Sequence, residues 1–161
     1  MLEADRLVVY AASEKEMNEI LEAEADAHLR EAYGEMLRGS LAHPEDWGWY
    51  ALWLIVRKDG KLIGNLSFKG SPEEGVVELG YGIHEDYRGY GYATEAVETI
   101  LAWAFDQPGV TSVAAETEAE NAASRRVLEK CGFLPAGTGR EGPRFVRNAD
   151  ASEDYELDYD L

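Results

Sequence analysis

The sequence predicts a single domain of mixed α/β fold, in which an antiparallel meander is followed by a crossover to a parallel strand. Between residues 50 and 83, β-prone runs are separated by polar turns, as in consecutive antiparallel strands. From Tyr92 to about Phe105, apolar residues recur at three- and four-residue steps, which predicts a helix. Residues 110–116 return to a β-prone run, and the order strand, helix, strand implies parallel pairing. The meander runs cover residues 50–57, 61–69 and 76–83.

The N-terminal part of the chain predicts a short strand followed by one or two helices. Residues 7–10 are β-prone, and Ser13 and Glu16 have the spacing of a capping box. Apolar residues then keep a helical spacing from about 14 to 38. We expect Gly39 to end this helical region.

The C-terminal part predicts one more helix and one more strand. Residues 121–131 have a helical pattern, and Gly132 is expected to close this helix. Residues 137–151 are rich in turn formers and predict a loop. Residues 155–161 alternate between polar and apolar and predict a terminal strand.

Composition limits the class of protein. A chain of 161 residues, 45% of them hydrophobic, can bury one core without cross-links. Its apolar runs are shorter than the roughly 20 residues of a membrane span, and Cys131 is its single cysteine, so we expect a cytoplasmic protein. A net charge of −17 argues against nucleic acid or anionic membranes as partners, because both bind through excess lysine and arginine. The charge either favours cationic partners or serves solubility alone.

Residues 86–95 join a predicted strand to a predicted helix through Gly89 and Gly91. Glycines allow a tight turn and close approach, and the first N–H groups of a helix carry partial positive charge, so this junction predicts a phosphate site. A Walker A loop is excluded because no lysine lies between Lys69 and Lys130. A dinucleotide fingerprint starting at Gly89 is excluded because its sixth position is threonine. An ordinary turn that caps a helix is the alternative.

Two motifs resemble the signatures of the GNAT N-acetyltransferases, which bind coenzyme A. The first is Arg-x-x-Gly-x-Ala at Arg88, Gly91 and Ala93. The second is an Asn-x-x-Ser helix that starts at Asn121 and ends in Lys-x-Gly-Phe at Phe133. The opening Asp-Arg-Leu-Val-Val and the serine of the second motif look most like the ribosomal-protein-alanine N-acetyltransferase (RimJ/RimL-like) branch.

This resemblance implies one GNAT domain over residues 1–161. Its fold would be a mixed, mostly antiparallel sheet of about seven strands flanked by about four helices, with a cofactor cleft between the strands that end near Ile83 and Glu116. It implies transfer of the acetyl group of acetyl-CoA directly to a primary amine, of a protein N-terminus or a small cationic molecule, by a monomer or homodimer without metal. The alternative is an inactive acyl-CoA-binding sensor or interaction module of the same fold.

The resemblance also implies which residues hold the coenzyme, through the backbone of the first motif and the start of the second. Asn121 is equally well explained as a helix N-cap, and Arg125 and Arg126 as exposed partners of Glu120 or Glu129. The residues that the resemblance assigns to coenzyme binding are Ile83, Arg88, Gly89, Tyr90, Gly91, Tyr92, Ala93, Thr94, Asn121, Ser124, Arg125 and Arg126.

Direct acetyl transfer needs a group that takes the amine proton and one that assists the leaving sulfur, but no nucleophilic residue. Glu78 lies where many GNAT enzymes place the first group, with a solvent-facing strand carboxylate as the alternative. Leu128 replaces the tyrosine that the family often uses for the second group. Ser124, one helical turn earlier, is therefore the predicted donor, unless it bonds the coenzyme arm or a backbone carbonyl. Cys131 is expected to pack in the core, and Tyr81 to be a packing or surface-loop aromatic rather than a catalyst.

Overall fold

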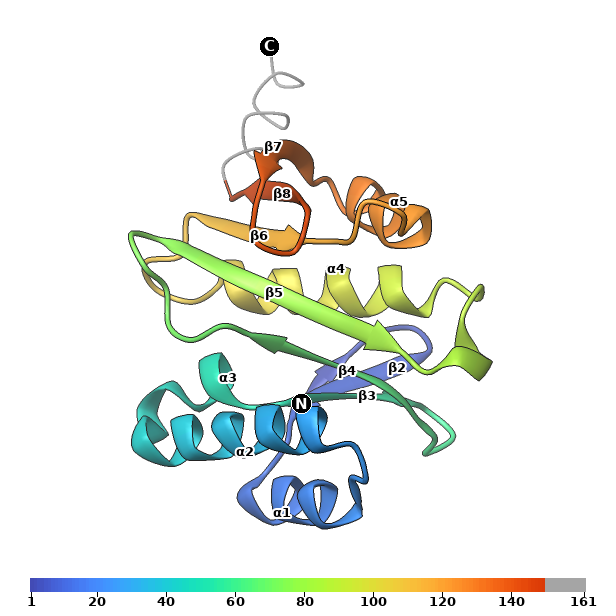
Figure 1. Cartoon of the computed structure of the whole chain (residues 1–161). Helices are drawn as coiled ribbons and strands as arrows, with labels where there is room; N and C mark the ends of the chain where they lie inside the picture. Colours follow the sequence, from blue (N-terminus) through green and yellow to red (C-terminus); the bar gives the residue numbers. More distant parts are fainter. Residues whose placement is uncertain (150–161) are drawn as a thin grey trace.

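An eight-stranded sheet runs through the computed structural model, which describes residues 1–149. The strands are β1 (Leu2–Glu3), β2 (Leu7–Ala11), β3 (Trp53–Arg57), β4 (Leu62–Phe68), β5 (Val76–Ile83), β6 (Ser112–Glu116), β7 (Leu134–Thr138) and β8 (Pro143–Asn148). They lie in chain order except at one edge, where β8 is inserted between β6 and β7 (Figure 1). The antiparallel meander β2–β5 and the parallel pair β5–β6 confirm the predicted mixed fold.

Helices cover both faces of this sheet. They are α1 (Glu14–Ala23), α2 (Ala27–Ala42), α3 (Trp47–Tyr50), α4 (Tyr92–Phe105) and α5 (Ala122–Lys130). The predicted capping box starts α1, since Ser13 Oγ accepts a hydrogen bond from the Glu16 N–H while the Glu16 carboxylate accepts one from the Ser13 N–H. Within residues 1–149, no helix has both the length and the apolar composition of a membrane span.

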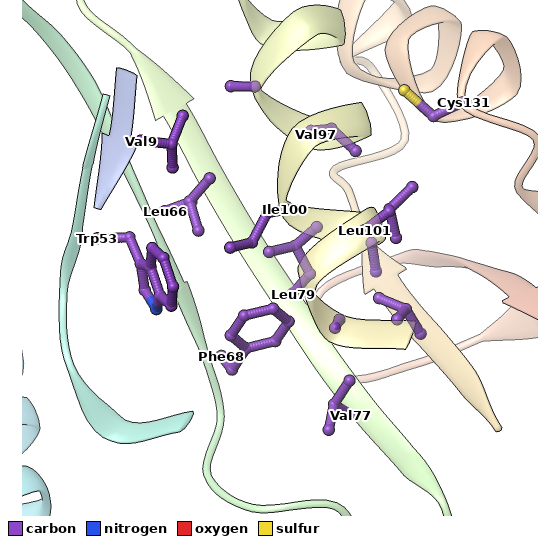
Figure 2. Close-up of a cluster of buried hydrophobic side chains, with 14 of the residues drawn as sticks. Val9, Trp53, Leu66, Phe68, Val77, Leu79, Val97, Ile100, Leu101 and Cys131 are labelled. Carbon is purple, nitrogen blue, oxygen red and sulfur yellow. The ribbon is translucent and has the colours of Figure 1, made fainter. Parts of the chain in front are cut away.

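The sheet separates two hydrophobic clusters. Residues of β3 alternate between them: Trp53 and Ile55 belong to the larger cluster with α4, and Leu54 belongs to the smaller cluster with α1 and α2. Figure 2 shows Leu66 of β4 pointing toward Ile100 of α4 in the larger cluster. This packing fixes α4 across the sheet, with its first turn near the C-terminal end of β5 (Figure 1).

β5 and β6 form a fork, because they pair over only the first part of β5. The parallel register ends where Glu78 lies opposite Ala114. Residues 79–83 continue β5 without a described partner in β6, although β4 remains paired with β5 as far as Gly64 opposite Ile83. The fork opens beside the first turn of α4.

The prediction that Gly39 ends a helix is wrong. Helix α2 continues through Gly39 to Ala42. A Cβ added at Gly39 would lie 3.0 Å from Cδ1 of Tyr50. Glycine at this position therefore serves close packing against the Tyr50 ring rather than helix termination.

The turn-rich stretch 137–151 is not all loop, because it contains the last two residues of β7 and the whole of β8, which pair antiparallel. Every residue of β7 is exposed, its pairing shifts register between Pro135 and Thr138, and Gly137 has a φ of +88°. An exposed edge strand with these features lacks the polar and apolar alternation that predicts a strand. The strand predicted at residues 155–161 lies outside the described residues.

Candidate functional site

A cavity of about 460 Å³ lies at the fork between β5 and β6. The end of β5 forms one wall, the first turn of α4 and the loop before it close one end, and α5 forms the opposite wall. The sequence predicted a cleft between the strands that end near Ile83 and Glu116, and the structure places α5, the helix after β6, along this cleft as its second wall. The lining residues are Tyr81, Gly82, Ile83, Tyr87, Arg88, Gly89, Gly91, Tyr92, Ala93, Thr94, Asn121, Ala123, Ser124, Arg126, Val127 and Lys130.

The N-terminus of α4 faces this cavity without a side-chain cap. Gly91 is the N-cap residue and has a φ of +81°. Because glycine has no side chain, it leaves the first N–H groups of the helix without a cap. In contrast, side chains cap α1, α2 and α5, where Ser13, Asp26 and Asn121 accept hydrogen bonds from backbone N–H groups. The first N–H groups of a helix have no intrahelical partner and carry partial positive charge, so this end of the cavity suits an anion.

The structure places all but two of the predicted coenzyme-binding residues around the cavity; the exceptions are Tyr90 and Arg125. The Tyr90 side chain is 62% exposed to solvent. Arg125 Nη1 donates a hydrogen bond to the Ala119 carbonyl at 2.5 Å. These two side chains are therefore not part of the cavity wall.

Basic side chains line the cavity in an otherwise acidic protein: Arg88, Arg126 and Lys130. Arg88 Nε donates to the Ile83 carbonyl at 2.9 Å, which ties the loop to the end of β5 and occupies that carbonyl. The seven ion pairs of residues 1–149 do not include Arg125 or any lining arginine. The positive charge of the lining is thus available to a bound anion.

Arg6, which precedes β2, bonds the loop and the first turn of α4 but is not among the cavity-lining residues. Its Nε donates to Glu95 Oε1 at 2.7 Å, and its backbone N–H donates to Glu95 Oε2 at 2.7 Å. Its Nη1 donates to the Tyr90 carbonyl at 2.8 Å, and its guanidinium carbon lies 4.4 Å from the centre of the Tyr92 ring. These contacts join the turn around Gly91 to the first turn of α4 and to the start of β2.

We expect Arg6→Ala to weaken acetyl-CoA binding several-fold, because the loop loses three side-chain contacts that fix its shape. The effect is modest because this side chain is 46% exposed, where water screens an ion pair. Calorimetry with acetyl-CoA measures it. Arg30→Ala is the matched control, since Arg30 also bonds a backbone carbonyl, that of Glu24, but lies outside the cavity lining. Equal affinities of Arg6→Ala and wild type would contradict this function of Arg6.

Two hydroxyl groups meet across the cavity. Tyr81 Oη lies 2.9 Å from Ser124 Oγ and also donates to the Ser124 carbonyl at 3.3 Å. Asn121 Oδ1 accepts from the Ser124 N–H at 3.0 Å, so Asn121 caps α5 as well as lining the cavity.

Leu128, on the same helix, is fully buried. Cys131 is buried as expected, and burial raises the pKa of its thiol to about 12, so it remains protonated.

Glu78 lies just before the fork, in an ionic network outside the cavity lining. Arg144 Nη1 lies 2.9 Å from Glu78 Oε1 and 2.7 Å from Glu116 Oε2, and Lys69 pairs with the other oxygen of Glu78. The backbone N–H of Glu141 and the Arg144 guanidinium hold the pKa of Glu116 below its ordinary value. Glu78 is therefore an ion-paired carboxylate whose side chain is 20% exposed.

Sequence reasoning did not assign a function to Arg6, Tyr81 or Arg144. Arg6 and Glu95 are 89 positions apart, and Arg144 and Glu78 are 66 apart, so no local motif contains either pair. The sequence could have indicated a function for Tyr81, because this residue lies on the predicted strand that leads to the phosphate loop. In the part of the chain that the structure describes, no cluster of three metal-ligating side chains occurs.

A family model described as the acetyltransferase (GNAT) domain matches residues 2–134. The uncharacterized N-acetyltransferase YjdG of Bacillus subtilis (strain 168) is 36% identical over 84 residues, which is 51% of this chain and 50% of that protein. The uncharacterized N-acetyltransferase YnaD of the same organism is 32% identical over 84 residues, or 52% of this chain and 49% of that protein. This chain thus matches only about half the length of these curated relatives.

Solved structures share the fold over nearly their whole length. A mutant of the spermidine N-acetyltransferase SpeG from Vibrio cholerae superimposes with a TM-score of 0.73 at 16% identity, covering 94% of this chain and 98% of that one. RimL, a ribosomal α-N-protein acetyltransferase in complex with coenzyme A, superimposes with a TM-score of 0.72 at 18% identity, covering 92% and 97%. Identities this low show the common fold alone, so the predicted ribosomal-protein branch stays a prediction.

Proposed function

The chain belongs to the GNAT acetyltransferase family, and we propose that it transfers the acetyl group of acetyl-CoA directly to a primary amine. The observation that carries this proposal is the uncapped N-terminus of α4, which opens into a cavity at the fork between β5 and β6. An uncapped helix end with a glycine N-cap suits a pyrophosphate. The cavity that leads from it along β5 suits the extended arm of the coenzyme.

The coenzyme would be held mainly by backbone groups. The N–H groups from Gly89 to Thr94 surround the expected pyrophosphate position, and Arg88, Arg126 and Lys130 add positive charge. Ile83 would bond the arm through its N–H, because its carbonyl already accepts from Arg88. In the reaction the amine nitrogen attacks the carbonyl carbon, the C–S bond breaks, and the electron pair stays on sulfur. The amine loses one proton and the coenzyme sulfur gains one.

For the acceptor we propose a cationic amine, either a small polyamine-like molecule or a protein N-terminus as in the ribosomal-protein branch. The chain has 32 acidic and 15 basic residues, and such an excess attracts cations toward the active site. Two proteins that share the fold are named for acceptors of these two classes. One is a spermidine N-acetyltransferase, and the other is a ribosomal α-N-protein acetyltransferase.

We expect the protein to release free thiol from acetyl-CoA when it is incubated with a cationic amine. We also expect kcat/KM to fall as the salt concentration rises from low to physiological ionic strength. The panel contains spermidine, antibiotic amines, peptides with free N-termini and anionic amino acids. N-acetylated forms of the same acceptors are the control, since they offer no free amine. Binding of acetyl-CoA without thiol release for any amine would contradict acetyl transfer. A cationic acceptor with a rate independent of salt would contradict steering by charge.

A further inference from the structure

Tyr81 places a phenol hydroxyl in the part of the cavity farthest from the phosphate loop along β5. The strand contributes three consecutive residues to the wall, and of these Tyr81 lies nearest to the fork, whereas Ile83 lies nearest to the loop. The phenol reaches across the cavity to α5, where its oxygen lies 2.9 Å from Ser124 Oγ. The hydroxyl pair therefore connects the two walls.

The reactive end of the coenzyme belongs at this same part of the cavity. The uncapped N-terminus of α4 sets the position of the pyrophosphate. Coenzyme A carries its pyrophosphate and its thiol at opposite ends of one extended arm. With the pyrophosphate at Gly91, an arm that follows β5 brings the sulfur toward the fork, past Ile83 and Gly82 to Tyr81.

We propose that Tyr81 is a catalytic residue that donates a hydrogen bond from its hydroxyl to the coenzyme sulfur as the C–S bond breaks. The proposal rests on the acetyl transfer proposed above. The electron pair of the broken bond stays on sulfur, the phenol keeps its proton, and the thiolate leaves with that hydrogen bond and takes its own proton from solvent. Ser124, the donor that the sequence predicts, is here a positioning residue: with its Oγ donating to Tyr81 Oη, the phenol hydrogen is free to turn from the Ser124 carbonyl to the sulfur.

The other candidates for this function are less suitable. Leu128, at the position of the family's tyrosine, has no polar group and is fully buried. The Cys131 thiol lies 3.7 Å from the Thr94 carbonyl and packs in the core. Burial raises the pKa of Tyr81 above its ordinary value, so the phenol remains a donor throughout the neutral range. Tyr81 thus supplies from β5 the phenol that α5 lacks at Leu128.

The test is a titration of the thiol of bound coenzyme A, followed through the ultraviolet absorbance of the thiolate. A hydrogen bond to the thiolate lowers the thiol pKa. We therefore expect Tyr81→Phe to raise the pKa of the bound thiol by about one unit, since a hydrogen bond to a charged group stabilises it by roughly tenfold or more. In turnover, Tyr81→Phe should lower kcat by about tenfold to a hundredfold with little change in the KM for acetyl-CoA.

Two further variants make the result specific. Tyr10→Phe removes a tyrosine hydroxyl that bonds Glu16 outside the cavity lining, and it should leave the thiol pKa unchanged. Ser124→Ala keeps the phenol but removes its partner, and it should raise the thiol pKa by less than Tyr81→Phe. It also provides the test if Tyr81→Phe does not fold. An unchanged thiol pKa in Tyr81→Phe, or in Ser124→Ala if Tyr81→Phe does not fold, would overturn the inference.

This titration separates the inference from the proposed function, because it needs coenzyme A and no acceptor. If wild-type protein does not bind coenzyme A, both the proposed function and the inference fail. If it binds coenzyme A and the thiol pKa is the same in wild type and Tyr81→Phe, only the inference about Tyr81 fails. If the thiol pKa shifts but no amine is acetylated, acetyl transfer fails, and with it the catalytic function of Tyr81.

Discussion

Replacing Gly91 with glutamate should reduce acetyl-CoA affinity by about a hundredfold or more. The backbone at Gly91 has a φ of +81°, which costs a residue with a Cβ roughly 1–2 kcal/mol. The new side chain would also start 3.4 Å from Arg6 Nη2, so it would disturb the guanidinium that holds the loop and bring a carboxylate close to the expected pyrophosphate. Two like charges about 4 Å apart near a protein surface repel by about 4 kcal/mol before screening by salt. Calorimetry with acetyl-CoA measures the loss.

Gly60→Glu is a closely matched control for this variant. Gly60 lies between β3 and β4, has a φ of +93°, and has no atom within 4 Å of an added Cβ. The two variants thus share the same new side chain and a similar backbone cost, but only Gly91 lines the cavity. Gly91→Ala separates the two causes, since it adds the Cβ without the charge. If Gly91→Glu binds acetyl-CoA with wild-type affinity, the hypothesis that this loop binds the coenzyme is wrong.

Local patterns predicted the parts of the site that depend on neighbours in the sequence. The loop around Gly91 follows from glycine conformation and from the start of a helix, and the caps at Ser13 and Asn121 follow from spacing alone. The parallel pairing of β5 and β6 follows from chain connectivity. Each of these features is set within one or two consecutive elements, which is why the sequence was sufficient.

Pairings between distant segments could not be predicted in the same way. The chain has 32 acidic residues, so the sequence cannot select Glu95 as the partner of Arg6, or Glu78 as a partner of Arg144. The side chain of Tyr81 bonds Ser124, 43 positions away, only because the fork separates β5 from β6 there. Such contacts depend on the geometry of the assembled sheet.

We propose, as the family resemblance implies, that Glu78 takes the amine proton, so replacing it with glutamine should lower kcat/KM by on the order of a hundredfold without weakening acetyl-CoA binding. Glu78 lies on the face of β5 opposite Leu79, together with Gly80 and Gly82. A Cβ added at either glycine would have no heavy atom within 4 Å, so this face is open from Glu78 to the cavity at Gly82. A water molecule on this face would relay the proton from the amine to the carboxylate.

The ionic network makes this substitution a test of chemistry rather than of folding. After Glu78→Gln, Arg144 keeps its ion pair with Glu116, and Lys69 keeps its pair with Glu141. Glu141→Gln is the matched control, because it removes a carboxylate from the same network at a side chain that is 58% exposed. We expect Glu141→Gln to retain kcat/KM within about twofold, as for exposed ion pairs in general. Thermal unfolding of both variants checks that the fold is intact.

The pH dependence distinguishes a proton acceptor from a residue that only holds the strand. Without Glu78, the reaction requires amine that has already lost its proton to solvent, and below the amine pKa this fraction rises about tenfold per pH unit. The difference between Glu78→Gln and wild type should therefore be largest at low pH and should narrow as pH approaches the acceptor pKa, about 8 for an N-terminus and about 10 for a lysine-like amine. Parallel pH profiles, offset by a constant factor, would instead assign Glu78 to holding Arg144 and Lys69 in place. Equal activity at every pH would remove Glu78 from the mechanism.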